Sequence, residues 1–259
     1  MTNRVCLALA WNPRGEQGRL QRFYPQLQAI YSSIVVSVPP DADPAAVDVL
    51  RALPGVIWTD EGWVSGRHTV MQAALRTDAD YIHYIDGDRL VRWIETCPEE
   101  LAQTVARMQT TDCLVIGRTP AAFATHPMAQ QQPEKLSNEV FSRLLGRRLD
   151  FSSGSKGFSR AAAEFLMRHS PSGHVMGTDS EWVILLHRAG YRIDAVEVDG
   201  LDWETADRYL DHAAHTETQR RVAAEYDADP EHWSFRVQVA QDIIDAGFAA
   251  LTRPLKEEP

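Results

Sequence analysis

Short apolar runs alternate with segments of helical periodicity along the chain, and this alternation constrains the fold more than any other feature. Apolar strands joined through helices by short connections are typical of a parallel sheet that helices cover on both faces. The sequence therefore predicts an α/β fold. Strands are expected at 4–11, 32–38, 55–60 and 80–86, and helices at 18–31, 43–53 and 65–77.

The remainder of the chain is expected to be more varied. Residues 118–138 are rich in proline, glutamine and alanine and lack periodicity, so they are predicted to form a long mobile loop. We interpret 1–210 as one domain and 211–259 as a helical C-terminal extension, broken at Asp229-Pro230. Strands are expected at 112–117 and 191–198, and helices at 98–109, 137–146, 159–169 and within 173–190.

Composition and charge exclude several classes of function. A formal net charge of −10 argues against a nucleic-acid partner, which usually demands a basic face. The chain has three cysteines, an odd number with no zinc-site spacing, and its start shows no leader pattern, so a cytoplasmic setting is expected. No apolar run approaches the roughly 20 residues that span a bilayer, so no integral membrane segment is expected.

Acidic residues follow three of the predicted strands. Asp41, Asp60 and Asp86 each come at a strand end, and ligands of parallel sheets bind beyond those ends. Asp86 and Asp88 flank Gly87, and alternate residues of an extended stretch point the same way. Carboxylate oxygens suit Mg²⁺ or Mn²⁺, although Asp-Gly-Asp is also a common polar turn. The setting at a strand end favours the metal site.

Three segments, in order, resemble a known family. They are GRHTVMQAALRTDADYIHYIDGD (66–88), NEVFSRLLGRRLDFSSGSKGFSR (138–160) and TDSEWVILLHRAGYRIDAVEV (178–198). Together they are similar to GT-A glycosyltransferases of family 2, in particular polyprenyl-phosphate mannosyltransferases, and to mannosylglycerate synthases. The resemblance covers roughly 4–200. It implies a GT-A (Rossmann-like), mostly parallel sheet and the metal-dependent transfer of a sugar from a nucleotide-sugar donor.

The resemblance also implies roles for individual residues. Asp179 or Glu181 would act as catalytic base in an inverting reaction, although both also suit a helix N-terminus. Asp86 and Asp88 would hold the Mg²⁺ or Mn²⁺, with a late histidine as third ligand, His215 foremost and His212 or His174 as alternatives. Donor-binding residues would be Trp11, Asp41, Asp60, Arg67, Asp86 and Gly87; acceptor-binding residues would be Gly154, Ser155 and Lys156.

The end of the family pattern is missing here, so a small or soluble acceptor is expected rather than a lipid. Two alternatives stay open. A sugar-phosphate nucleotidyltransferase would use a glycine-rich basic loop, for which Arg14, Gly15 and Gly18 are candidates. A GT-A-like module without activity would bind sugar nucleotides only. The C-terminal segment carries apolar residues near one face, for packing or for a homodimer: Trp233, Val237, Ile244, Phe248 and Leu251.

Overall fold

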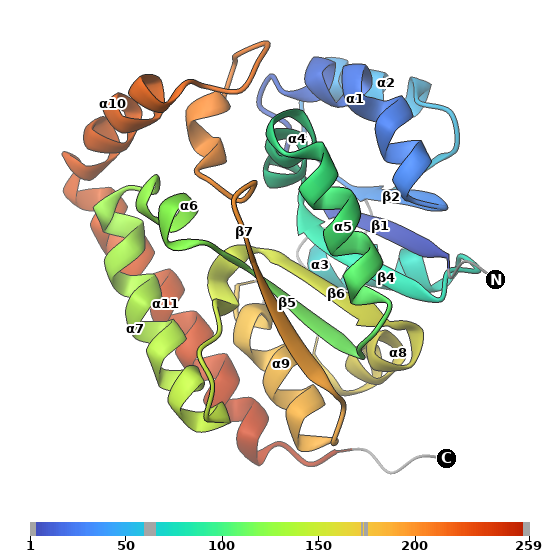
Figure 1. Ribbon diagram of the computed structural model, residues 1–259, viewed down its shortest axis with the longest axis vertical. Helices are drawn as coiled ribbons and strands as arrows, with labels where there is room; N and C mark the ends of the chain where they lie inside the picture. Colours follow the sequence, from blue (N-terminus) through green and yellow to red (C-terminus); the bar gives the residue numbers. More distant parts are fainter. Residues whose placement is uncertain (1–3, 60–65, 172, 174–175, 256–259) are drawn as a thin grey trace.

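A seven-stranded sheet forms the centre of the computed structural model, which describes residues 4–59, 66–171, 173 and 176–255 (Figure 1). The strand order is β3-β2-β1-β4-β6-β5-β7. Strand β6 runs antiparallel to β4 and β5, and the other pairs are parallel. This confirms the expected α/β class. The strands are β1 (Val5–Ala10), β2 (Ser33–Ser37), β3 (Val56–Thr59), β4 (Tyr81–Asp86), β5 (Cys113–Arg118), β6 (Ser155–Ser159) and β7 (Ile193–Val198).

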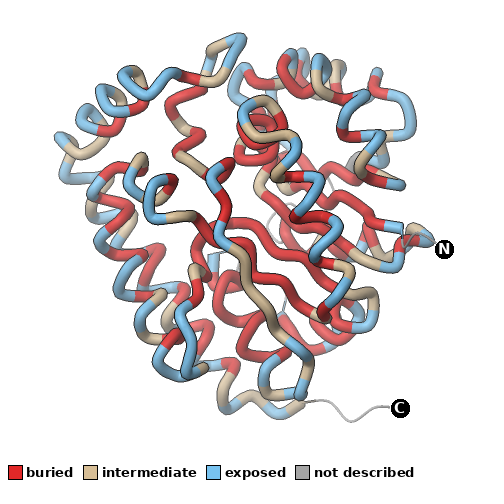
Figure 2. Tube along the Cα trace, viewed as in Figure 1, coloured by how far each residue is buried: buried red, intermediate tan, exposed pale blue. Residues whose placement is uncertain are grey.

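Helices cover both faces of this sheet, because the strands present apolar side chains on both faces. In β1, Leu7 and Leu9 join one apolar core while Cys6 and Ala8 join the other, because successive side chains of a strand point to opposite faces. Figure 2 shows β1, β2, β4, β5, β6 and the inner sides of the helices as mostly buried, whereas the edge strand β7 is largely intermediate. The helices on the Leu7 side are α1 (Gln17–Ile30), α2 (Pro44–Ala52), α4 (Gly87–Thr96) and α5 (Pro98–Met108).

The opposite face carries a larger set of helices. They are α3 (Gly66–Leu75), α7 (Met128–Leu145), α8 (Arg160–His169), α9 (Thr178–Arg188) and α11 (Pro230–Thr252). The short α6 (Pro120–Ala124) follows β5, and α10 (Thr216–Asp227) precedes α11. Two 3-10 turns, η2 (Phe151–Ser153) and η3 (Glu204–Asp207), complete the described elements. Among the residues in this structure's described ranges, no helix is both long and apolar enough to cross a bilayer.

The prediction of a long mobile loop over 118–138 is wrong, because α6 and most of α7 occupy it. Residues Ala129, Pro133 and Phe141 of α7 are buried, but polar Gln130 is buried beside them, which hides the apolar periodicity. The cap of this helix also comes from far along the chain. Asp227 accepts hydrogen bonds from the backbone N–H groups of Met128 and Ala129, at 2.9 and 2.8 Å. Because the capping residue is so distant in the sequence, no local pattern predicts this cap.

Helix α11 packs on α7 and α9 through a face that includes only part of the predicted set. Ile244 and Leu251 pack against the core, whereas Val237 and Phe248 are exposed. Ile243 and Gly247, which were not predicted, are buried. The Ser180 hydroxyl donates to the backbone carbonyl of Ile243 at 2.5 Å. A Cβ on Gly247 would come within 2.2 Å of the Phe141 ring, so the helices approach closely there. The break at Asp229-Pro230 is confirmed, whereas the domain boundary at 210 and the homodimer stay predictions.

Candidate functional site

A pocket of about 420 Å³ opens where β1 and β4 end at their carboxyl ends. Its wall includes the first residues of α3 and α4, the segment around η3, and one side chain of α11. Three carboxylates and five guanidinium groups line it, in a chain whose net charge is −10. The lining residues are Ala10, Trp11, Asn12, Arg14, Gly66, Arg67, Tyr84, Asp86, Asp88, Arg89, Met176, Glu204, Thr205, Arg208 and Arg236.

Asp86, the last residue of β4, lies between two arginines. Its Oδ2 atom is 3.6 Å from Nη2 of Arg67 and 3.7 Å from Nε of Arg89. The Tyr84 hydroxyl donates to Oδ1 at 2.6 Å. About a quarter of the side chain stays accessible from the pocket, 27%. The carboxylate is therefore held in place by neighbours and still open to a ligand.

Asp88 lies in the first turn of α4. Asp86 and Asp88 therefore reach the same pocket because a helix begins after Asp86, and not because alternate residues of an extended stretch point the same way. The chain does not stay extended after Asp86, because α4 begins at Gly87. Burial, and then the carboxylates of Glu204 and Asp86, raise the pKa of Asp88 to about 7. Several acids thus meet around Asp88, and a bound cation would reduce the repulsion between them.

Gly87 lets Trp11 pack against the start of α4. A Cβ at this position would lie 2.2 Å from the Trp11 ring, closer than any real contact. Gly87 itself does not line the pocket, whereas Trp11 does, with its indole N–H buried and without a hydrogen-bond partner among the described residues. Of these two predicted donor-binding residues, Trp11 lines the pocket, whereas Gly87 contributes by leaving room for the Trp11 ring.

Gly154 presses the segment before β6 against Asp86. Its φ is +69°, a left-handed conformation, and an added Cβ would lie 2.5 Å from Oδ2 of Asp86. The Asp86 backbone N–H donates to the Gly154 carbonyl at 3.1 Å. The predicted acceptor-side glycine thus contacts the acidic pair.

We expect Gly154→Ala to displace the Asp86 carboxylate and to weaken metal-dependent nucleotide binding at least tenfold. Gly146→Ala is the matched control, because Gly146 has φ +67° but nothing within 4 Å of an added Cβ. Both variants should lose about 1 kcal/mol of stability from the left-handed conformation. Calorimetric titration with Mn²⁺ and a nucleoside diphosphate separates them. Equal binding by the two variants would contradict the contact described above.

Asp179 forms a buried ion cluster instead of facing the pocket. Its Oδ1 accepts from Nη1 of Arg67 at 2.9 Å and from Nζ of Lys156 at 3.0 Å. Burial alone would raise the pKa of Asp179, but the charges of Arg67 and Lys156 outweigh it and lower the pKa below its ordinary value. A carboxylate with a lowered pKa and two cationic partners is a weak base. It positions Arg67, which does line the pocket.

Glu181 is fully buried away from the pocket. Its carboxylate accepts from the Ser170 hydroxyl and from Nη1 of Arg253, the latter at 2.5 Å. The predicted turn at 154–156 is also different in part, because β6 begins at Ser155. The Ser155 hydroxyl pairs with Nε2 of His83 at 3.0 Å. Glu181, Ser155 and Lys156 are therefore not brought to the pocket surface.

Other predicted residues lie elsewhere. Asp41 is exposed after β2 and does not line the pocket, and His215 precedes α10 with its ring 5.8 Å from that of His212. Asp60 and His174 lie outside the described residues. Within the described part of the chain, no three histidine, cysteine or acidic side chains form a metal-binding group. The predicted pair, Asp86 and Asp88, does line the pocket.

The structure adds residues that the sequence analysis missed. Tyr84 is two residues before Asp86 and Arg89 is the residue after Asp88, so proximity to the motif is a signal that could have found them. Glu204, Arg208 and Arg236 carry no such signal, because they lie more than 100 positions away and reach the pocket only through the fold.

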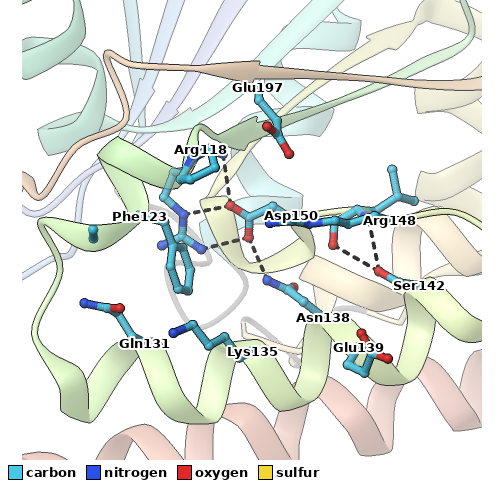
Figure 3. Close-up of a pocket in the computed structure, with 13 residues that line it drawn as sticks. Arg118, Phe123, Gln131, Lys135, Asn138, Glu139, Ser142, Arg148, Asp150 and Glu197 are labelled. Atoms are coloured by element: carbon cyan, nitrogen blue, oxygen red, sulfur yellow. Dashed lines mark hydrogen bonds and ion pairs between the residues drawn. The ribbon is translucent and has the colours of Figure 1, made fainter.

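A second cavity, of about 510 Å³, lies beside α7 (Figure 3). Its wall contains Arg118, whose guanidinium is fully buried and pairs with Asp150 at 2.7 Å and Glu134 at 2.7 Å. Asn138 donates to the same Asp150 carboxylate at 2.8 Å. The buried charges in this wall thus bind one another. The cavity has no counterpart of the strand-end acid pair.

Comparisons with known proteins show the fold. No protein-family model matches the sequence, and no curated protein matches it. Among solved structures, a mycobacterial protein superimposes with a TM-score of 0.62 at 12% identity, over 98% of this chain and 76% of that one. Glucosyl-3-phosphoglycerate synthase of M. tuberculosis matches with a TM-score of 0.59 at 14% identity, over 98% and 82%. The same synthase in complex with Mn²⁺, uridine diphosphate and phosphoglyceric acid gives 0.58 at 12%, over 98% and 80%. The expected GT-A architecture is confirmed.

Proposed function

We propose that the protein is a metal-dependent glycosyltransferase that transfers a sugar from a nucleoside-diphosphate donor to a small, soluble acceptor. The observation that carries this proposal is the placement of Asp86 and Asp88 beside Trp11 and five arginines in one pocket at the strand ends. Solved proteins of the same fold were crystallised with Mn²⁺, uridine diphosphate and phosphoglyceric acid, which supports donor and metal of this kind.

The residues present fit a divalent cation. Asp86 and Asp88 provide hard oxygen ligands, and Glu204 has a buried Oε2 atom without a hydrogen-bond partner among the described residues. Mg²⁺ and Mn²⁺ usually bind few protein carboxylates and complete their shell with water and phosphate oxygens. When bound, such a cation neutralises the negative charge that develops on a departing diphosphate.

The surrounding residues supply positioning and charge. Arg67 is held by Asp179 and Thr178 and lies 3.6 Å from Asp86, so it can meet a phosphate beside the metal site. Helix α4 begins at Gly87, and the positive end of its dipole favours an anion there. Asp179 and Glu181 face inward, so the described residues give no support to an inverting reaction that uses either as base.

Nucleotide binding tests this proposal by thermal unfolding. Uridine and guanosine diphosphates and their sugar derivatives are added with Mn²⁺, or with a chelator. A ligand at a hundred times its dissociation constant stabilises a fold by about 2.7 kcal/mol, so the melting temperature should rise by about 5 °C or more in Mn²⁺ only. If no nucleotide shifts it with any divalent metal, the proposal fails.

Turnover separates the alternatives. A transferase releases free nucleoside diphosphate from the donor when an acceptor is present, whereas a binding module gives the thermal shift without release. A nucleotidyltransferase would instead release pyrophosphate from a nucleoside triphosphate. The glycine of its expected loop has another role here, since an added Cβ on Gly15 would lie 2.8 Å from the Tyr209 backbone.

A further inference from the structure

Arg89 is buried in the pocket wall without a hydrogen bond from its guanidinium group to any described residue. Only 7% of the residue is exposed, and its nearest carboxylates are Asp86 at 3.7 Å and Glu204 at 3.9 Å, beyond hydrogen-bond distance. Its Nη1 atom is fully buried and unpartnered. An arginine has five N–H donors, and leaving them unused in a buried place costs free energy. A ligand group with several acceptor oxygens would satisfy them.

Besides Arg67, four arginines line the pocket, and they fall into two pairs. The Tyr209 backbone N–H donates to the Arg14 carbonyl at 3.0 Å, so the segments that carry Arg14 and Arg208 lie side by side. Arg89, in α4, and Arg236, in α11, line the pocket from other elements. We call these the Arg14–Arg208 pair and the Arg89–Arg236 pair.

Among the described residues, the guanidinium groups of Arg14, Arg208 and Arg236 have no carboxylate within 4 Å. Arg236 donates from Nε to the Tyr226 hydroxyl at 3.2 Å, which leaves its other N–H groups for a ligand. The pocket thus carries more positive charge than one diphosphate would use, because a metal bound to Asp86 and Asp88 also neutralises that group.

We propose that the Arg89–Arg236 pair binds an anionic group of the acceptor, a carboxylate or a phosphate. This inference rests on the function proposed above. The Arg14–Arg208 pair remains for the donor diphosphate, because Arg14 lies in the loop after β1, three residues after Trp11, a predicted donor-binding residue that lines the same pocket. Arg89 instead adjoins the segment before β6, where its Nε would be 3.0 Å from a Cβ on Gly154. Planar guanidinium groups match carboxylate and phosphate oxygens in two-bond contacts.

The experiment uses four three-carbon probes that differ in charge: glycerol, glycerate, glycerol 3-phosphate and 3-phosphoglycerate. Each is titrated calorimetrically into the full-length protein saturated with Mn²⁺ and the nucleoside diphosphate that it binds. The variants are Arg89→Gln and Arg236→Gln, and Arg220→Gln on exposed α10 is the control, because Arg220 lies outside the pocket. Melting temperatures verify that each variant folds.

We expect the charged probes to bind wild type and glycerol not to bind. Both pocket variants should weaken binding of the charged probes by about ten- to a hundredfold, the range for charged hydrogen bonds. Nucleotide affinity should change less than about threefold in Arg236→Gln, and the control should match wild type. Arg89→Gln should also weaken nucleotide binding, because Arg89 lies 3.7 Å from Asp86. A comparison of the affinities for glycerate and glycerol 3-phosphate shows whether the site prefers a carboxylate or a phosphate.

Several results would overturn the inference while leaving the proposed function intact. They are equal binding of glycerol and the charged probes, wild-type affinity for the charged probes in both variants, or a loss of nucleotide binding in Arg236→Gln as large as its loss of anion binding. If wild type itself fails to bind nucleotide with Mn²⁺, the proposed function fails, and this inference with it.

Discussion

Asp88→Asn should abolish metal-dependent nucleotide binding, with a loss of affinity of about a hundredfold or more. Asp86 and Asp88 are the two acids of the strand-end motif that line the pocket, and an amide is a far weaker ligand for Mg²⁺ or Mn²⁺ than a carboxylate. Metal–phosphate contacts contribute several kcal/mol, so losing one of two protein ligands removes most of this affinity. Calorimetric titration of nucleoside diphosphate in Mn²⁺ measures the effect.

The same substitution should leave the metal-free fold intact. Asp88 is surrounded by Glu204 and Asp86, so removing its charge relieves repulsion instead of breaking a pair. Its melting temperature without metal should equal or exceed that of wild type. Asp48→Asn is the control for charge alone, since Asp48 is exposed on α2, at 77% of its side chain. Unchanged nucleotide affinity in Asp88→Asn would show that Asp88 holds no metal for nucleotide binding.

The sheet could be predicted because its information is local. Each parallel strand is a short apolar run, and each is bounded by residues that end strands, as Asn12-Pro13 does after β1. The start of helix α2 could be predicted from Asp43 followed by Pro44. The Asp43 side chain caps the helix by accepting from the Ala45 backbone N–H at 3.0 Å. Strand β6 escaped prediction, because SKGFS has a lysine and a glycine where apolar residues are expected. Its Lys156 is tolerated only because Asp179, from another element, neutralises it.

The candidate site could be predicted only near Asp86-Gly87-Asp88, because there too the sequence information is local. Strand order places the ends of β1 and β4 side by side, so the sequence could place Trp11 with Asp86. Asp41, after β2, is one strand further away and does not line the pocket. Arg236 reaches the site from a helix near the C-terminus, through packing of α11 on α9 that no local pattern reveals. Asp179 was expected to act as a catalytic base, and its burial against Arg67 and Lys156 could be seen only in the structure.

Asp150→Asn should cost about 3 kcal/mol of unfolding free energy, the largest stability effect that we expect of a single charge. Asp150 accepts from the Arg118 backbone N–H at 3.0 Å, from Nε at 2.7 Å and from Nη2 at 2.8 Å (Figure 3). Removing one partner of a buried ion pair costs about 3–5 kcal/mol, because the other charge is left uncompensated. The lower end of this range applies, since Glu134 still pairs with Arg118.

The stability lost in Asp150→Asn should become smaller as the pH falls. Burial alone would raise the pKa of Asp150, but Arg118 outweighs it and lowers the pKa to about 2, against an ordinary value of 3.8. A lowered folded-state pKa stabilises the fold above the unfolded value, by about 2 kcal/mol here. This contribution is fully present above pH about 4 and is lost as the pH falls towards about 2. The stability difference between wild type and Asp150→Asn should therefore shrink over that interval.

Urea unfolding at a series of pH values measures this difference. Glu139→Gln is the matched control, because Glu139 lines the same cavity but pairs with Arg143 on the surface, with 59% of its side chain exposed. Surface pairs of this kind contribute about 0.5 kcal/mol or less. A loss in Asp150→Asn no larger than in Glu139→Gln, or one that does not change between pH 5 and pH 3, would show that the Arg118 guanidinium finds its compensation without Asp150.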